Sequence, residues 1–198
     1  MFAGSSVWRE YENVEKVPFI FQKWAPYLLF GESCWRALLI PVWLAYSAPM
    51  HLTLAHVGAR SASRDGLDSL ANTYLERSTT WAQCGSEAFR TEGALFEWVL
   101  RKQGRAKAIL VLFDSRGKQM SSEAFAAWLG ARRDEGAQHI VFAVGPADGW
   151  SDESKAKAQL LLSLGPMTMA HSLARLVAAE QIYRAFTILA GHPYHGGH

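Results

Sequence analysis

The sequence has few of the residues and motifs that mark several common protein classes. Its 198 residues include only two cysteines, Cys34 and Cys84, which stand far apart. They form neither a disulfide framework nor a zinc site with closely spaced ligand pairs. No run of about 20 apolar residues is present, so the sequence predicts no membrane-spanning helix. We therefore expect a protein of the reducing cytoplasm with no membrane partner.

The sequence also lacks a strong excess of positive or negative charge, and it lacks the common nucleotide-binding motifs. The chain carries 20 Lys and Arg against 18 Asp and Glu, a net charge of +2, which excludes a strongly polybasic binding protein. No G-x-G-x-x-G follows a predicted strand and no G-x-x-x-x-G-K-[ST] occurs, which disfavours a standard dinucleotide fold and a P-loop NTPase. The apolar fraction of 49% is typical of a folded domain with its own core.

The composition changes near Met50. Residues 1–49 hold four of the eight Trp, none of the seven His, and four basic and four acidic side chains. We expect two parts, an N-terminal extension over 1–49 and a domain over 50–198. The interpretation we favour is that the protein starts at Met50 and that 1–49 is not translated. The alternative is a genuine helical extension.

From Met50 onward, short apolar runs alternate with amphipathic patterns, which predicts an α/β fold with a parallel sheet and helices on both faces. Strands are expected at Leu52–Val57, Thr79–Cys84, Ala108–Phe113, His139–Val144 and Leu161–Leu164. Helices are expected at Ser63–Arg77, Glu92–Lys102, Ser121–Arg133, Asp152–Leu160 and His171–Leu189. Ser121 is placed to cap its helix, with Glu123 in the first turn.

Three of the predicted strands end in loops that contain glycine, at 114–118, 145–149 and 165–169. Ligands of open parallel sheets bind at the carboxyl ends of strands, and glycine lets the backbone approach a ligand closely. The loops therefore predict a ligand pocket; the alternative is three ordinary turns.

Histidines supply the other candidate site residues. His171 and Arg175 stand four apart at the start of the last helix and so share a face, which suits an anionic ligand or a reacting base. The alternative is an ordinary pair on the helix surface. The tail 192–198 is rich in histidine but holds no Cys, Asp or Glu to complete a ligand set, so we expect no metal.

Five segments and the start of the domain resemble the RlmH family, which methylates a pseudouridine of 23S ribosomal RNA at ring N3 with S-adenosylmethionine. The segments occur in family order over residues 50–198. They are FDSRGKQMSSEAF at 113–125, VGPADG at 144–149, SLGPMTMAH at 163–171, EQIYRA at 180–185, HPYH at 192–195, and the opening MHLTLAHVG at 50–58.

The resemblance implies a SPOUT-type fold with a C-terminal trefoil knot, a homodimer, and the ribosome with its 23S rRNA as substrate. It places the methyl donor, S-adenosylmethionine, in the knot near the subunit interface. There main-chain groups would read the adenine edge and apolar side chains would cover its faces. By position, the family's donor-binding residues fall on Phe113, Gly145, Leu164, Gly165, Pro166, Met167, Thr168 and Met169.

The N3 proton must leave before or as the methyl group arrives, so the enzyme must favour a developing anionic ring. We expect His171, Arg175 and Arg184, with Tyr194 and His195 of a tail that the partner subunit can supply, to form that environment. Candidate phosphate contacts are Arg101, Lys102, Arg105, Lys107, Arg116 and Lys118.

Four positions depart from the family's pattern, one of which is Ala59, where a lysine is often found. Pro146 replaces a common second glycine and removes a backbone N–H, Ala170 stands where proline is usual, and Gly196 stands where a basic residue commonly follows. Two other functions remain open at this level. One is a non-catalytic knotted module for RNA binding or ribosome assembly, and the other is a SPOUT methyltransferase for another RNA.

Overall fold

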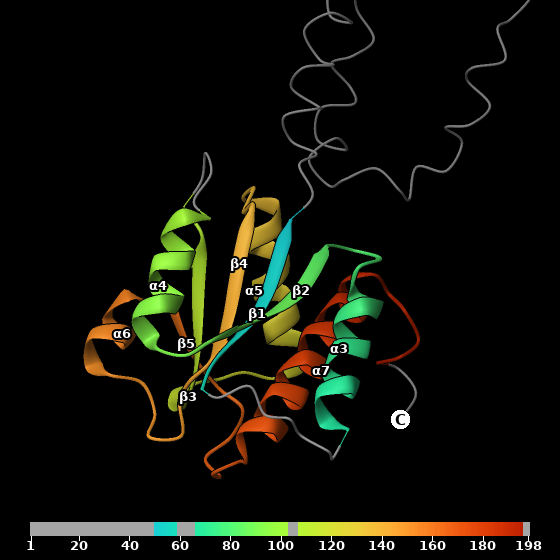
Figure 1. Cartoon of the computed structure of the whole chain (residues 1–198). Helices are drawn as coiled ribbons and strands as arrows, with labels where there is room; N and C mark the ends of the chain where they lie inside the picture. Colours follow the sequence, from blue (N-terminus) through green and yellow to red (C-terminus); the bar gives the residue numbers. More distant parts are fainter. Residues whose placement is uncertain (1–49, 59–65, 103–106, 196–198) are drawn as a thin grey trace, which may run out of the picture. The chain divides into compact units, whose positions relative to one another are not determined.

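The computed structural model describes residues 50–58, 66–102 and 107–195 (Figure 1). The predictions for residues 1–49, Ala59, Arg105 and Gly196 lie outside these ranges. The described part contains a five-stranded sheet in the order β2-β1-β4-β3-β5, and every strand pair is parallel. The strands are β1 (His51–Val57), β2 (Gln83–Phe89), β3 (Ile109–Gln119), β4 (His139–Val144) and β5 (Leu160–Ser163).

Helices cover both faces of the sheet, which confirms the predicted α/β class (Figure 1). They are α3 (Leu67–Ser78), α4 (Glu92–Arg101), α5 (Ser122–Asp134), α6 (Asp152–Lys157) and α7 (His171–Leu189). One core lies between the sheet and the helices α3, α5 and α7, and a second lies between the opposite face and α4.

The central strands β1 and β4 carry apolar side chains on both faces because both faces are buried. Along β1, Leu52 and Leu54 enter the first core, while Ala55 and Val57 enter the second. This alternation is the period of two expected of a strand. Two buried polar residues interrupt this apolar run, Thr53 and His56, and His56 has only 7% of its surface exposed.

Local signals fix the helix starts. The Ser121 hydroxyl accepts a hydrogen bond from the Ala124 N–H at 3.2 Å, and Thr91 caps α4 through the Ala94 N–H at the same distance. The predicted cap at Ser121 is therefore confirmed. The helix predicted from Asp152 ends at Lys157, before Leu160, because the chain turns extended at Ala158 to enter β5.

The strand predicted at Thr79–Cys84 is wrong. Residues 79–82 form a turn in which the Trp81 N–H donates to the Ser78 carbonyl at 3.0 Å, and β2 occupies Gln83–Phe89. This strand lies at the edge of the described sheet and pairs with β1, and none of its seven residues is fully buried; the polar residues Gln83, Ser86 and Glu87 are exposed. An edge strand of this kind gives little hydrophobic signal.

β3 continues past its predicted end at Phe113. Its pairing with β5 breaks between Phe113 and Lys118 and resumes at Lys118 and Gln119. Since all strands are parallel, their carboxyl ends meet at one edge of the sheet, where the loops after β3, β4 and β5 converge. The trefoil knot stays a prediction. In the ranges that the structure describes, no helix is both long enough and apolar enough to cross a membrane.

Candidate functional site

A cavity of about 570 Å³ lies at the carboxyl edge of the sheet. Its walls are residues 113–116 at the break in β3, the loops at 144–150 and 164–170, and His171 and Ala174 at the start of α7. They overlap the three segments that the sequence singled out. The volume lies within the roughly 300–1,000 Å³ usual for small-molecule sites.

Trp150 joins two of these loops. It is buried, and its Nε1–H donates to the Phe113 carbonyl oxygen at 3.0 Å. Its ring packs on Gly145 so closely that a Cβ there would lie 2.8 Å from the indole. The absence of a side chain at Gly145 therefore lets Trp150 hold the ends of β3 and β4 together.

Ser163, the last residue of β5, joins the third loop to the first. Its hydroxyl accepts from the Gly165 N–H at 3.1 Å and lies 3.1 Å from the Ser115 carbonyl oxygen, to which it can donate. Gly165 has φ +132°, a conformation that side-chain-bearing residues rarely adopt. The loop after β5 is thus shaped by one serine and one glycine.

An ion pair lies in the cavity wall. The Lys155 ammonium is 3.3 Å from the Asp114 carboxylate, which also accepts from the Arg116 N–H at 2.8 Å. Burial alone would raise the pKa of Asp114, but the Arg116 N–H and Lys155 outweigh it and lower the pKa. Asp114 is therefore anionic at neutral pH, with its charge offset by Lys155.

Of the eight residues predicted to bind the donor, seven line this cavity; Pro166 does not and is exposed. The seven are Phe113, Gly145, Leu164, Gly165, Met167, Thr168 and Met169. Met167 is 78% exposed, so its side chain stands at the surface of the cavity. Leu164, Met167 and Met169 contribute apolar side chains to the wall.

His171 is the predicted catalytic residue that lines the cavity. Its Nε2 atom is buried and has no hydrogen-bond partner of ordinary geometry within the described residues. Burial and the positive charge of Arg175 lower the pKa of His171, while the backbone of Gly145 and Val57 and the charge of Asp68 act in the other direction. The ring is therefore uncharged at neutral pH.

Arg175, one turn further along α7, faces a different environment. It is 8% exposed and forms an ion pair with Asp68 of α3. It lines a second, smaller cavity of about 280 Å³ together with His56 and Asp68, and it is absent from the lining of the large cavity. The structure thus places His171 and Arg175 on one side of α7 but against separate cavities.

The other three predicted catalytic residues lie away from the large cavity of their own chain. Arg184 donates to the Glu180 carboxylate at 2.6 and 2.9 Å, and the Tyr194 hydroxyl donates to the same oxygen at 3.1 Å. His195 Nε2 lies 2.9 Å from a Glu123 carboxylate oxygen. Contacts with α7 and α5 therefore dock the tail on the same chain.

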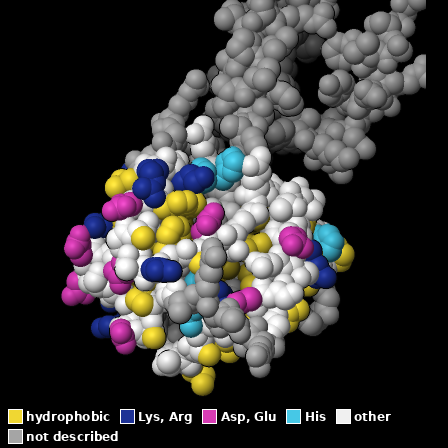
Figure 2. Space-filling view, viewed as in Figure 1, with side chains coloured by type: hydrophobic (Ala, Val, Ile, Leu, Met, Phe, Trp, Pro, Cys, Tyr) yellow, Lys and Arg dark blue, Asp and Glu magenta, His cyan; other side chains and the backbone are white. Residues whose placement is uncertain are grey.

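The face shown in Figure 2 carries charges of both signs. Figure 2 shows Lys and Arg side chains interspersed with Asp and Glu on the side that it displays. This agrees with the small net charge of +2. Among the described residues no group of three His, Cys, Asp or Glu could hold a metal ion.

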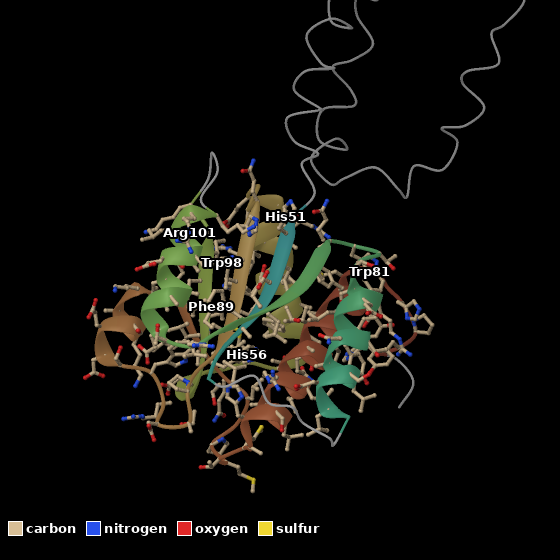
Figure 3. All side chains as sticks on the ribbon, viewed as in Figure 1. His51, His56, Trp81, Phe89, Trp98 and Arg101 are labelled. Atoms are coloured by element: carbon tan, nitrogen blue, oxygen red, sulfur yellow. The ribbon has the colours of Figure 1, made fainter. Side chains whose placement is uncertain are left out.

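Sequence reasoning missed four residues that shape the site: His56, Asp68, Trp150 and Lys155. A signal existed for His56, because a histidine inside a buried apolar strand is uncommon. Figure 3 places it at the carboxyl end of β1, beside α7, with His51 at the opposite end of the strand. Asp68, Trp150 and Lys155 act through contacts with segments far apart in the chain, and no local sequence pattern reveals such contacts.

Comparisons with known proteins agree with one another. The family model described as "Predicted SPOUT methyltransferase" matches residues 50–195. A protein named ribosomal RNA large subunit methyltransferase H from Koribacter versatilis is 43% identical over 149 residues, which are 75% of this chain and 100% of the relative. A protein of the same name from Brucella ovis is 51% identical over 88 residues, 44% of this chain and 52% of its own length.

Solved structures show weaker likenesses. The SpoU methyltransferase AviRb from Streptomyces viridochromogenes, in complex with AdoMet, gives a TM-score of 0.44 at 13% identity and covers 69% of this chain and 58% of its own. A probable methylase family protein from Haemophilus influenzae gives 0.46 at 9% identity, with 73% and 69% covered.

Proposed function

The chain belongs to the SPOUT methyltransferase family, and from that membership we propose that it methylates a pseudouridine of 23S ribosomal RNA at ring N3 with S-adenosylmethionine as donor. The observation that carries the proposal is the large cavity. Three strand-end loops build it, and seven of the residues that the family resemblance assigns to the donor lie in its wall. The substrate is the assembled ribosome, in the cytoplasm.

The cavity fits the donor chemically. An adenine ring needs polar groups at its edge and apolar groups on its faces, and here glycine-containing backbone alternates with Leu164, Met167 and Met169. The bound donor supplies a methyl group on a positively charged sulfur. The residues of this chain hold it, orient it toward the acceptor nitrogen and exclude water.

The acceptor nitrogen starts with a proton, which must leave for the methyl group to bind there. Three side chains of the cavity wall can accept a proton: Asp114, Asp148 and His171. Asp114 is held by Lys155. An uncharged imidazole matches a proton transfer near neutral pH better than a carboxylate does. We therefore assign the proton to His171.

The tail serves the site of the partner in a homodimer. In its own chain, the tail with Tyr194 and His195 does not line the cavity. Beside that cavity two large apolar side chains are exposed, Met167 at 78% and Leu173 at 41%. If a second copy covers these side chains, its tail would reach the donor bound to the first copy. Arg184 of the second copy, on the helix that precedes the tail, would lie close to that site. Sedimentation equilibrium tests the dimer.

RNA contact rests on exposed cations near the strand-end loops and the end of α4. Arg116 lies in the break in β3 and Lys118 lies where the pairing resumes. All five described candidates are exposed: Arg101, Lys102, Lys107, Arg116 and Lys118. Salt bridges to phosphates from such residues position an RNA but do not select its sequence. Selection of one pseudouridine then falls to the cavity and the tail.

The test is methyl transfer from labelled S-adenosylmethionine to 70S ribosomes of a strain without this activity, with the product mapped by mass spectrometry. The full chain is compared with His171→Asn and with His139→Asn, a control at the amino end of β4. We expect label on one 23S pseudouridine from the full chain and the control, and a loss of 100-fold or more from His171→Asn, within the roughly 10²–10⁴ of general base catalysis.

Other outcomes separate the alternatives. Label on a different RNA would identify a SPOUT methyltransferase with another substrate. Donor binding without label on the ribosome would also point to another RNA, whereas loss of donor binding together with the label would favour the non-catalytic module. Full activity of His195→Ala across pH would exclude the tail histidine from a proton role.

A further inference from the structure

A line of polar side chains runs beneath the wall of the donor cavity, from α3 through α7 to β1. Asp68 of α3 pairs with Arg175 Nη2. The other terminal nitrogen, Nη1, lies 3.1 Å from His56 Nε2 and 3.4 Å from His56 Nδ1. The His56 ring in turn meets the His171 ring edge to face, with centroids 5.5 Å apart and planes at 65°. Asp68, Arg175, His56 and His171 thus form one connected set.

Burying these polar and charged side chains costs desolvation free energy, so a role beyond packing is expected for them. Arg175 and His56 are 8% and 7% exposed. A buried guanidinium is tolerated only with a partner, which Asp68 provides. His56 lies among Leu54, Ala55 and Val57, where an apolar residue would pack without the cost of a buried polar ring. Packing alone therefore does not account for a histidine at this position.

The direction of the hydrogen bond follows from the chemistry of the two groups. An arginine stays protonated and can only donate, so one of the two His56 nitrogens near Nη1 must carry no proton and accept the hydrogen bond. Asp68 in turn holds the guanidinium. The His56 ring therefore has one orientation set by Arg175, and it offers His171 a fixed, uncharged neighbour.

His171 lies between this neighbour and the ends of two strands. A Cβ built on Gly58, just past β1, would lie 4.0 Å from His171 Nε2, and Gly145 lies just past β4. The titratable and charged groups around the ring are His56 of β1, Asp68 of α3, Arg175 of its own helix, and the charged residues of the cavity wall, Asp114, Arg116, Asp148 and Lys155. Of these, His56 is the one in ring contact with it.

We propose that His56 is a positioning residue for methyl transfer: held by Arg175 and Asp68, it fixes the uncharged His171 ring against the wall of the donor cavity. The inference rests on the proposed function, in which His171 accepts the N3 proton. It assigns a role to a residue that does not line the cavity. It also explains why Arg175 turns away from that cavity.

Three substitutions separate the effects of space and hydrogen bonding. His56→Ala removes both the ring and the acceptor, His56→Phe keeps the volume, and His56→Gln keeps an acceptor for Arg175. In single-turnover methylation of ribosomes, we expect His56→Ala to lower the saturating rate roughly tenfold, since a general base contributes about 10²–10⁴ and is here displaced but not removed. His56→Gln should recover most of the rate and His56→Phe less. The KM for the donor should change less than twofold.

The pH profile and an NMR titration give readouts that a merely structural role would not move. Without His56, water reaches the His171 ring, burial disfavours its charged form less, and the pKa of His171 rises. The acid limb of the rate profile and the His171 Cε1–H titration should both move to higher pH in His56→Ala. His171→Asn assigns the NMR signal. His139→Asn, which alters a ring stacked on His51 at the other end of the sheet, should change neither readout.

Equal rates and an unmoved acid limb in all three variants would overturn the proposal, as would an unmoved His171 titration in His56→Ala and His56→Phe. The NMR arm uses the protein without ribosomes. If the unaltered enzyme methylates no pseudouridine, the proposed function fails, and the titration still decides whether His56 sets the state of His171.

Discussion

Individual residues decide the shape of the donor cavity, and Gly145 is the sharpest case. Its contact with the Trp150 indole leaves no room for a side chain, and Trp150 is in turn held by the Phe113 carbonyl. Any side chain at 145 must therefore displace a ring that joins two of the three loops. The sequence indicates that glycine matters here, but only the fold identifies the ring that requires it.

Gly145→Ala should weaken S-adenosylmethionine binding at least tenfold, about 1.4 kcal/mol, because the new methyl group would lie 2.8 Å from the indole. Isothermal titration calorimetry measures the affinity. Gly93→Ala is the control, since the side-chain oxygen nearest to its Cβ is 4.0 Å away on Thr91. Equal donor affinities in Gly145→Ala and the unaltered protein would contradict the packing argument.

The charge state of His171 gives a second prediction. Its folded pKa is lowered from the ordinary value of 6.5 by burial and by Arg175. The unfolded chain therefore binds the proton first, and the contribution of His171 to stability is complete above about pH 6.5 and is lost as the pH falls below it. Urea unfolding should show a lower free energy of unfolding at pH 5.5 than at pH 7.5.

The difference between the two pH values should shrink in His171→Asn. It should persist in His192→Asn, which alters an exposed histidine of the tail. If the difference is as large in His171→Asn as in the unaltered protein, other groups carry the pH dependence and His171 is not buried uncharged as described.

At the scale of elements, the break in β3 shapes the site. The strand leaves its pairing with β5 after Phe113 and resumes at Lys118, and the residues between form one wall of the cavity. The renewed pairing of β3 with β5 depends on Gly117. A Cβ added to this glycine would lie 2.7 Å from the Leu161 carbonyl group and 2.8 Å from the Leu162 nitrogen. These are backbone atoms of β5, which cannot swing aside as a side chain can.

Gly117→Ala should therefore lower the free energy of unfolding by about 1–3 kcal/mol, the usual cost of overpacking. Denaturant unfolding measures it. Gly85→Ala on β2 is matched in chemistry but meets nothing within 4 Å, and it should stay within about 0.5 kcal/mol. Equal midpoints for the two variants would show that β3 and β5 adjust more freely than their pairing indicates.

Elements also explain which local predictions held. The start of α5 and both ends of β4 agree with the sequence because the Ser121 cap and a largely apolar run determine them. The bounds of α7 also agree, although no side chain caps its start. β2 was displaced because an edge strand with polar, exposed residues lacks such a run. The extension of β3 was missed because Asp114, Ser115 and Arg116 are polar and read as a loop.

At the scale of the whole molecule, charge is balanced and binding to a ribosome must use a few local contacts. With a net charge of +2 and mixed signs on the face shown in Figure 2, no long-range field directs the RNA. Two exposed cations of β3, Arg116 in the cavity wall and Lys118 two residues further on, then carry a large share of the phosphate contacts.

Ribosome binding should weaken as salt rises from 50 to 200 mM, and Arg116→Ala and Lys118→Ala should each reduce the slope of log K against log salt by about one, the release of one counterion. Filter binding at several salt concentrations measures the slopes. Arg133→Ala removes a cation already paired with Asp134 at the end of α5 and should leave the slope unchanged. A flat salt response of the unaltered protein would remove these contacts.

The sequence and the tertiary structure determined different features of this protein. The sequence by itself determined the α/β class, most element boundaries, the three loops and the family, because periodicity, caps and contiguous motifs are local. Tertiary structure alone decided that Trp150 closes the cavity on Gly145, that Lys155 offsets Asp114, and that Asp68 and Arg175 hold His56 against His171. Those contacts join residues from different elements, and their energies depend on burial and distance, which exist only once the chain has folded.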